Sequence, residues 1–308
     1  MLKLGERIFM NITKNINKII NILFVICLIS ILMVVSTDSL VLLLSIPIVL
    51  VAIKLNYGFV ELISILVASI IVGYLFMDIE TLGFEVIPIL LLTLILAIIS
   101  KSNLSDKNQI ALNFLLTSII FIGLYKYQMV YRGLDLSKMA DELKEVFEQN
   151  TEYAIPDKTY ELSVSLYPAI LSSLSLIYAF ISLKLVRNFM AYKNKGSDMI
   201  ALNMLRISKK DFIILVIISI GIYLVVPALF AINQEFVMAN IIWILNSILL
   251  LNGMSVYDYL ISRRRSNLSR GMQWFFVIIL FYFFAILFMI IGIFDIFLDF
   301  RARRERSL

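Results

Sequence analysis

The sequence contains no histidine and a single cysteine, Cys27. With one cysteine the chain cannot form an internal disulfide, and without histidine it lacks the usual ligand sets for zinc and haem. Histidine is also the commonest general acid or base in enzymes. We therefore expect no metal, no cofactor and no catalytic residue.

Short enzyme motifs are missing as well. The sequence has no His-Glu-x-x-His, no Gly-x-Ser-x-Gly, no Walker loop and no glycine-rich dinucleotide fingerprint. A membrane enzyme that works with carboxylates alone stays open as an alternative. The prediction is a protein that is not an enzyme.

Charged residues are scarce, at 16% of the chain against about 25% in soluble domains, whereas hydrophobic residues reach 61%. The apolar residues form continuous runs, long enough to cross about 30 Å of hydrocarbon at about 1.5 Å per residue. Inside lipid only helices and closed barrels satisfy the backbone, and barrel strands would alternate in polarity. The sequence predicts an all-α polytopic transmembrane helix bundle with the lipid bilayer as its solvent.

Nine apolar runs are candidate spans in one integral-membrane domain over residues 1–308. They are Ile19–Val35, Leu40–Ile53, Phe59–Met77, Leu82–Ile99, Gln109–Tyr125, Ser163–Leu185, Phe212–Ala231, Phe236–Leu260 and Met272–Phe297. The second run is short, giving about 21 Å of helix, and contains Pro47. The prediction is therefore eight or nine helices.

Basic residues indicate the orientation. With the N-terminus in the cytoplasm, the short outside turns hold acidic residues such as Asp78 and Glu235 and no Lys or Arg. The inside segments then carry most of the basic residues, which follows the positive-inside rule. The net charge of +5 is thereby explained by membrane orientation, and we expect no nucleic acid partner.

One feature conflicts with nine crossings, because these would place the tail outside with Arg301, Arg303, Arg304 and Arg306. Either the tail breaks the positive-inside rule, or the last run enters the membrane without a net crossing.

The longest polar interval, residues 126–161, is predicted to be an extracytoplasmic insertion with five basic and eight acidic residues. Apolar residues recur at helical spacing from Leu136 to Phe147, with Asp135 placed to cap the start and Asn150 to end the helix. This pattern predicts a short amphipathic helix. Such a helix lies on the membrane, covers the bundle, or acts as a lid over a ligand site.

Polar residues within the spans are the candidates for ligand binding, because burying them in lipid is costly. In the eighth run, Asn240 and Asn246 share a broad helix face with small residues such as Gly253. This face either bonds neighbouring helices or forms the wall of a ligand site. Glu85 is either solvated at the membrane interface or part of such a site. A ligand cavity lined by Asn240, Asn246 or Glu85 is the hypothesis.

Two carboxylate groups are candidates for ion pairs. Asp295 and Asp299 lie four residues apart with Arg301 close behind, which predicts a structural ion-pair cluster at the end of the last run. Asp258 is expected to pair with Arg263 or Arg264.

Three segments carry a family resemblance: Ser45-Ile-Pro47-Ile-Val-Leu before Leu55-Asn-Tyr57-Gly58, then Leu251-Asn-Gly253-Met-Ser-Val256, and Gly292-x-x-Asp295 with Asp299-Phe-Arg301. Together they resemble the YybS-like family of uncharacterised bacterial membrane proteins. The resemblance implies a bacterial plasma membrane location. It also implies that the six spans before residue 190 are similar to substrate-binding components of energy-coupling-factor transporters, without a ligand motif to carry over.

Two functions follow as hypotheses. The first is a solute-binding or transport-related membrane protein. The second is a membrane scaffold or regulatory subunit of an envelope assembly, in which the basic segments 184–210 and 263–270 bind a membrane or cytoplasmic partner protein.

Overall fold

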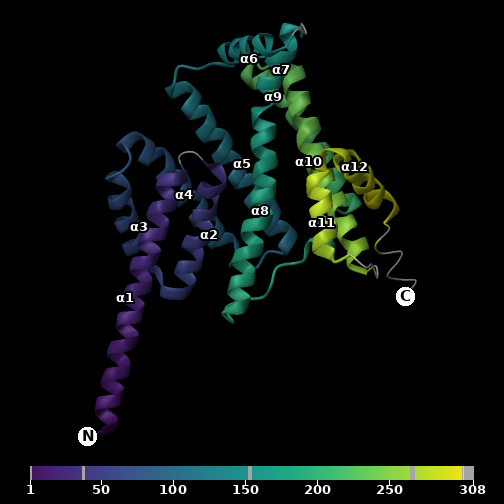
Figure 1. The fold of residues 1–308 in the computed structure, drawn as a ribbon. Helices are drawn as coiled ribbons and strands as arrows, with labels where there is room; N and C mark the ends of the chain where they lie inside the picture. Colours follow the sequence, from purple (N-terminus) through teal and green to yellow (C-terminus); the bar gives the residue numbers. More distant parts are fainter. Residues whose placement is uncertain (1, 37–38, 152–154, 264–267, 300, 302–308) are drawn as a thin grey trace. The chain divides into compact units, whose positions relative to one another are not determined.

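The computed structural model describes residues 2–36, 39–151, 155–263, 268–299 and 301. Every regular element in these ranges is a helix (Figure 1). The helices follow the apolar runs, because a helix satisfies its own backbone hydrogen bonds in lipid. The fold class is therefore the predicted all-α polytopic membrane protein.

Seven stretches of the described chain are helical, long and apolar enough to cross a membrane. They are Lys18–Ser36, Ile79–Ile99, Asp106–Tyr131, Asp157–Tyr192, Lys209–Phe230, Gln234–Arg263 and Phe281–Leu298. Two shorter apolar helices, Leu42–Tyr57 and Phe59–Tyr74, coincide with the second and third predicted spans. Each of the nine predicted runs is thus helical, although the sixth and the ninth are each divided between two helices, and the short run continues through Pro47.

The helices fall into two compact units, residues 1–105 with 180–198, and residues 106–179 with 199–308. We refer to them as the first and second unit. Helix α8 (Tyr167–Tyr192) contributes its residues up to Ala179 to the second unit and the rest to the first. The single domain over 1–308 stays a prediction.

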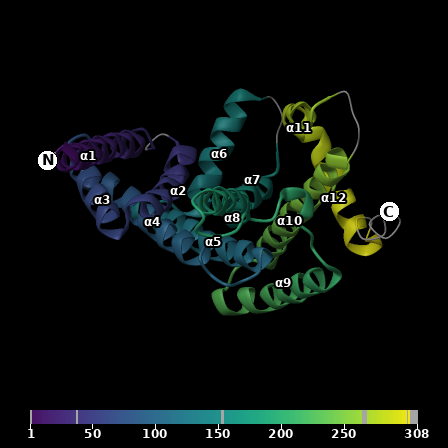
Figure 2. The same cartoon turned by 90° about the horizontal axis from the view of Figure 1, so that it is seen from below.

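The first unit contains α1 (Leu2–Ser36), α2 (Leu40–Tyr57), α3 (Phe59–Tyr74) and α4 (Ile79–Ile99). Helix α1 packs against α2 and α3, and α2 packs against α4 (Figure 2). Their shared core is aliphatic: Ile29, Met33, Ile46, Leu50, Ile53, Leu62, Ile65, Leu82 and Ile89.

The second unit begins with α5 (Asp106–Tyr131), α6 (Leu136–Asn150) and α7 (Asp157–Ser165). Helix α6 is the amphipathic helix expected in the polar interval. It starts after Asp135, whose carboxylate accepts a hydrogen bond from the backbone N–H of Lys138 at 2.8 Å, and it ends at Asn150 as predicted. Phe147 of α6 packs edge-on against Tyr160 of α7.

A connecting segment, residues 199–208 with the short 3₁₀ helix η1 (Leu202–Met204), leads from α8 to α9 (Lys209–Phe230). Ser208 and Asp211 form a reciprocal capping box that starts α9. Helix α10 (Gln234–Arg263) follows, then α11 (Arg270–Ile279) and α12 (Phe281–Leu298).

The last predicted span, Met272–Phe297, is wrong as a single helix. The chain bends at Leu280, with φ −100° and ψ 22°, so α12 does not continue the axis of α11 (Figures 1 and 2). Nothing in the local sequence marks this bend, because the run has neither proline nor glycine near Leu280. The packing of α12 on α10 provides the reason.

Helices α10 and α12 approach each other at two glycines. A Cβ atom on Gly253 would lie 1.8 Å from the Phe288 carbonyl oxygen, and one on Gly292 would lie 2.2 Å from the Leu249 carbonyl oxygen. Only glycine allows backbones to come this close. The bend at Leu280 lets α12 cross α10 at this point.

Candidate functional site

The connecting segment 199–208 is held by side chains from neighbouring helices of the second unit. Asp106 accepts a hydrogen bond from the Ile200 N–H at 2.7 Å, and Asn252 accepts one from the Ile207 N–H at 3.3 Å. The Ser255 hydroxyl donates to the Leu202 carbonyl at 2.6 Å. A stretch without regular helical hydrogen bonds is therefore satisfied by α5 and α10, as buried backbone requires.

Arg301 completes this arrangement. Its side chain is 5% exposed, and it pairs with the fully buried Asp295 at 2.7 Å. The same guanidinium donates to the Leu205 carbonyl and to the Ser255 hydroxyl, both at 2.8 Å. Several hydrogen bonds to a paired guanidinium compensate the cost of burying the charges.

The backbone around Asp299 directs Arg301 to this place. Asp299 ends α12 in the left-handed region, with φ 54°, a conformation that Asp tolerates better than most residues. Its carboxylate pairs with Arg206 of the connecting segment. The three residues expected to form one cluster thus form two ion pairs, Asp295 with Arg301 and Asp299 with Arg206.

Asp258 binds two residues that the sequence did not suggest as its partners. It accepts hydrogen bonds at 2.8 Å from Arg270 and from the Trp274 indole, both in α11. Arg263 lies over the Tyr259 ring, and Arg264 lies outside the described residues, so the predicted pairing with Arg263 or Arg264 stays a prediction. The connection from α10 to α11 brings Arg270 back to α10, which sequence spacing does not reveal.

A pocket of about 290 Å³ lies next to the connecting segment in the second unit. Its floor is buried and mostly apolar, with Ile110, Leu176, Leu205 and Asn252. Further apolar residues line its walls: Ala111, Phe114, Ile207, Ile214, Leu215, Ile248 and Leu251.

Three charged residues line this pocket, and we call them the charged rim: Lys107, Arg206 and Asp211. Lys107 and Asp211 are half-exposed and lie 4.0 Å apart. The Arg206 Nε is buried and has no hydrogen-bond partner in the described part of the chain. A mostly apolar lining with a few polar groups is typical of ligand sites.

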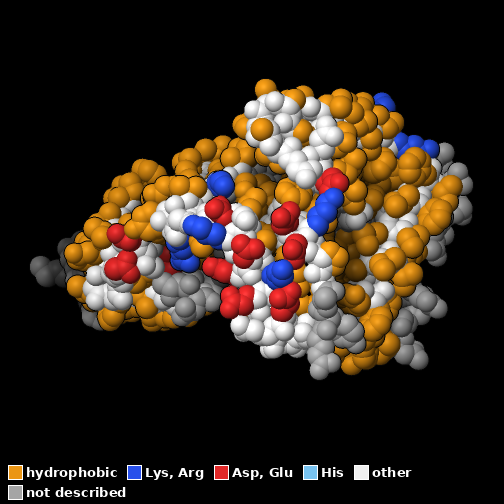
Figure 3. All heavy atoms as spheres, turned by 90° about the horizontal axis from the view of Figure 1, so that it is seen from above, with side chains coloured by type: hydrophobic (Ala, Val, Ile, Leu, Met, Phe, Trp, Pro, Cys, Tyr) orange, Lys and Arg blue, Asp and Glu red, His pale blue; other side chains and the backbone are white. Residues whose placement is uncertain are grey.

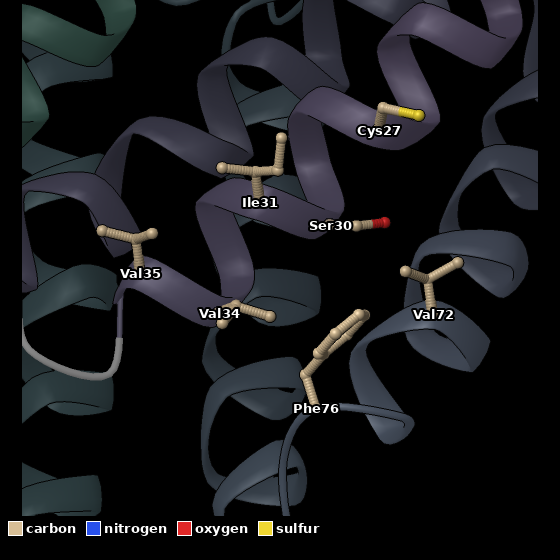
Figure 4. A pocket seen from close by; sticks show the side chains of 7 residues that line it. All are labelled: Cys27, Ser30, Ile31, Val34, Val35, Val72 and Phe76. Carbon is tan, nitrogen blue, oxygen red and sulfur yellow. The ribbon is translucent and has the colours of Figure 1, made fainter.

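A second pocket of about 290 Å³ lies in the first unit, between α1 and the end of α3 (Figure 4). Figure 4 shows Cys27 and Ser30 pointing towards the side where Val72 and Phe76 lie. The Ser30 hydroxyl already donates to the Ile26 carbonyl at 2.8 Å. This pocket offers hydrocarbon contacts and no charged group, so it suits a lipid chain better than a polar solute.

Asn240 has a structural role in the second unit. Its amide donates to the Ser165 carbonyl and accepts from the Ala169 N–H at 2.9 Å, across the junction between α7 and α8. Pro168 lacks an N–H, so the helix cannot continue normally there. Asn240 supplies the missing bonds, and its role as a ligand group stays a prediction.

The other two ligand candidates are not brought together with Asn240. Asn246 is exposed on α10 and does not line the pocket. Glu85 belongs to the first unit, where it is buried and contacts the Ser36 hydroxyl at 3.1 Å. The pocket that the structure contains is instead lined by residues that the sequence did not single out, such as Lys107 and Arg206.

Acidic side chains gather over α6 and α7 (Figure 3). Lys144 of α6 pairs with Asp157 of α7 at 2.8 Å, and this hydrogen bond raises the pKa of the lysine. Leu143 and Val146 of α6 stay 40% and 59% exposed beside these charges. The two helices therefore present a mixed acidic and apolar surface.

Within the described ranges, no group of three or more Cys, Asp or Glu residues is arranged to hold a metal ion. The chain matches the model of a family of predicted membrane proteins, DUF2232, over residues 21–296, and it belongs to this family. No curated protein and no solved structure matches it. The resemblance to YybS-like proteins and to energy-coupling-factor components stays a prediction.

Proposed function

We propose that this membrane protein is a non-enzymatic, solute-binding or transport-related protein of the bacterial plasma membrane, and that its ligand occupies the pocket in the second unit. The observation that carries the proposal is the pocket itself, with an apolar floor and a charged rim. Its volume lies near the lower end of the range of about 300–1,000 Å³ for ligand sites. The ligand is accordingly a small molecule or one hydrocarbon chain.

The walls of the pocket come from segments far apart in the sequence, on α5, α8, α9, α10 and the connecting segment. The side that bears Leu205, Arg206 and Ile207 is fixed by Asp106, Asn252, Ser255 and Arg301. Rigid support of this kind reduces the entropy lost on binding. This pre-organisation favours a binding site over an accidental gap between helices.

A filled pocket tests the proposal. Ile248→Trp places a large side chain into the pocket from α10, and Ile214→Trp does so from the exposed face of α9. Small molecules extracted from purified protein are quantified by mass spectrometry. We expect one compound near equimolar amount in the wild type and its loss in both variants, with Gly221→Ala on α9 as the control. Equal recovery from all four proteins would exclude this pocket as the site.

The scaffold function is the second candidate, favoured by the exposed Leu143 and Val146 on the charged surface of α6 and α7. The basic segments 184–210 and 263–270 are the proposed contact with a membrane or cytoplasmic partner, with residues 264–267 outside the described part. Cross-linking in intact membranes tests it. A defined partner that is lost on Val146→Glu or Lys193→Gln favours the scaffold, and a chain cross-linked to no other protein argues against it.

A further inference from the structure

We infer that the ligand of this pocket is an amphiphile with one hydrocarbon chain and an anionic head group, which binds Arg206 in competition with Asp299. This inference rests on the proposed function, because it concerns the same pocket. It assigns the head group to the charged rim and the chain to the apolar floor.

The charges at the rim favour an anion. The pocket lining holds two cations, Lys107 and Arg206, and one carboxylate, Asp211, while the carboxylate that pairs with Arg206, Asp299, is not among the lining residues. The Lys107–Asp211 pair is half-exposed and 4.0 Å apart, and such pairs contribute little to stability, so Lys107 is available to another anion. A cationic head group would meet two like charges.

Arg206 provides the specific contact. Its guanidinium pairs with Asp299, while its Nε is buried and without a hydrogen-bond partner among the described residues. A buried donor without a partner is unfavourable, and guanidinium binds phosphate and carboxylate through two parallel hydrogen bonds. A head-group oxygen at Nε would supply the partner that the described residues do not provide.

The apolar part of the pocket selects for a chain. Ile110, Leu176 and Leu205 at the floor are each less than 9% exposed. A free inorganic anion would reach the rim and leave this floor unfilled. An amphiphile satisfies both parts, with its head group at the charged rim and part of its chain on the apolar floor.

A variant of Asp299 should strengthen ligand binding, whereas a variant of Arg206 should weaken it. An anionic head group and Asp299 compete for the same guanidinium, so removing the Asp299 charge should strengthen binding. Asn has nearly the same shape and also tolerates the left-handed backbone at this position, where φ is 54°. Asp299→Asn therefore changes the charge and leaves the end of α12 intact.

The test uses the purified full chain in a neutral detergent, titrated with 1-oleoyl lysophosphatidic acid, 1-oleoyl lysophosphatidylcholine or inorganic phosphate. Binding is followed by native mass spectrometry and by the unfolding temperature. We expect the anionic lipid to bind at least about tenfold more tightly than the zwitterionic one, and phosphate not to bind. Arg206→Gln should lower the affinity for the anionic lipid about tenfold, and Asp299→Asn should raise that affinity.

Lys209→Gln is the matched control, since Lys209 is an exposed cation that does not line the pocket. An equal loss of affinity for the anionic lipid in Lys209→Gln and Arg206→Gln would show that binding depends on general charge attraction, and it would overturn the inference. Equal binding of both lipids, abolished by Ile214→Trp, would overturn the head-group assignment and keep the pocket as a binding site. Binding of either lipid that Ile214→Trp and Ile248→Trp leave unchanged would exclude the proposed function as well.

Discussion

Arg301 and Asp295 show how a single residue determines stability in this protein. Asp295 is fully buried, and Arg301 is its ion-pair partner at 2.7 Å. Arg301→Met should lower the free energy of unfolding by about 3–5 kcal/mol, because it leaves a buried charge without a partner. Unfolding in detergent, followed by circular dichroism, measures the loss.

The double variant Arg301→Met with Asp295→Leu is the control. It removes both charges, so it should be more stable than Arg301→Met alone. The two charges do not interact if the unfolding free energy lost in the double variant equals the sum of the losses in Arg301→Met and Asp295→Leu.

Asp78 gives a pH-dependent prediction. The Thr81 backbone N–H and hydroxyl donate to its carboxylate at 2.8 Å each, which holds the pKa of Asp78 below its usual value. The folded-state pKa is lowered, so this stabilisation is present above the unfolded pKa of about 3.9 and is lost as pH falls through the folded value. Asp78→Ala should therefore lower the unfolding temperature at pH 7. At a pH below the folded-state pKa of Asp78, the variant and the wild type should unfold at the same temperature.

Asp78→Asn separates the contribution of the helix-capping hydrogen bond from that of the carboxylate charge. Asn also caps helices well and does not titrate, so this variant should unfold near the wild-type temperature at pH 7. The same unfolding temperature for Asp78→Ala and wild type at pH 7 would contradict the role of Asp78 as the cap of α4.

At the level of elements, the crossing of α10 and α12 depends on Gly253 and Gly292. Gly292→Ala should destabilise the protein by about 1–3 kcal/mol or more, because its Cβ would overlap the Leu249 carbonyl. Gly221→Ala on α9 is the matched control, since a Cβ there meets no atom within 4 Å. Thermal stability measured by size-exclusion chromatography compares the two, and equal stability would contradict the close crossing.

The elements themselves were largely predictable from sequence, because run length and hydropathy decide which segments enter lipid. The start of α6 at Asp135 was predictable from capping chemistry. The bend at Leu280 was not, because it results from the packing of α12 on α10. The pocket was not predictable either, because Lys107, Arg206 and Ile248 lie far apart in the sequence and meet only through tertiary structure.

At the level of the whole molecule, the contacts of α11 and α12 indicate on which side of the membrane the Arg-rich C-terminal tail lies. Helix α11 starts at Arg270, which binds Asp258 near the end of α10. Arg301, just after α12, binds the connecting segment that precedes α9. Phe288 and Gly292 contact α10 between Leu249 and Tyr257, about 12 Å of helix. We therefore expect both ends of this helix pair on one side of the membrane.

Labelling of the chain tests this topology. In a Cys27→Ser background, Ser137→Cys on α6 should react with a membrane-impermeant maleimide on intact cells, and Lys193→Cys should react only after permeabilisation. If α11 and α12 make no net crossing, a reporter fused to the C-terminus lies on the side of Lys193. A reporter on the side of Ser137 would show that α12 crosses the bilayer. Residues 302–308, with Arg303, Arg304 and Arg306, lie outside the described part.

A helix pair that enters and leaves at one face has a mechanical consequence for the bilayer. Such a pair would add more cross-sectional area to one leaflet than to the other, so the second unit would act as a wedge in the membrane. Lipid packing around a wedge is least strained where the leaflet that holds it is convex. We expect the protein to concentrate in membrane regions curved in that sense, and to enrich in small vesicles over large ones when its orientation is fixed.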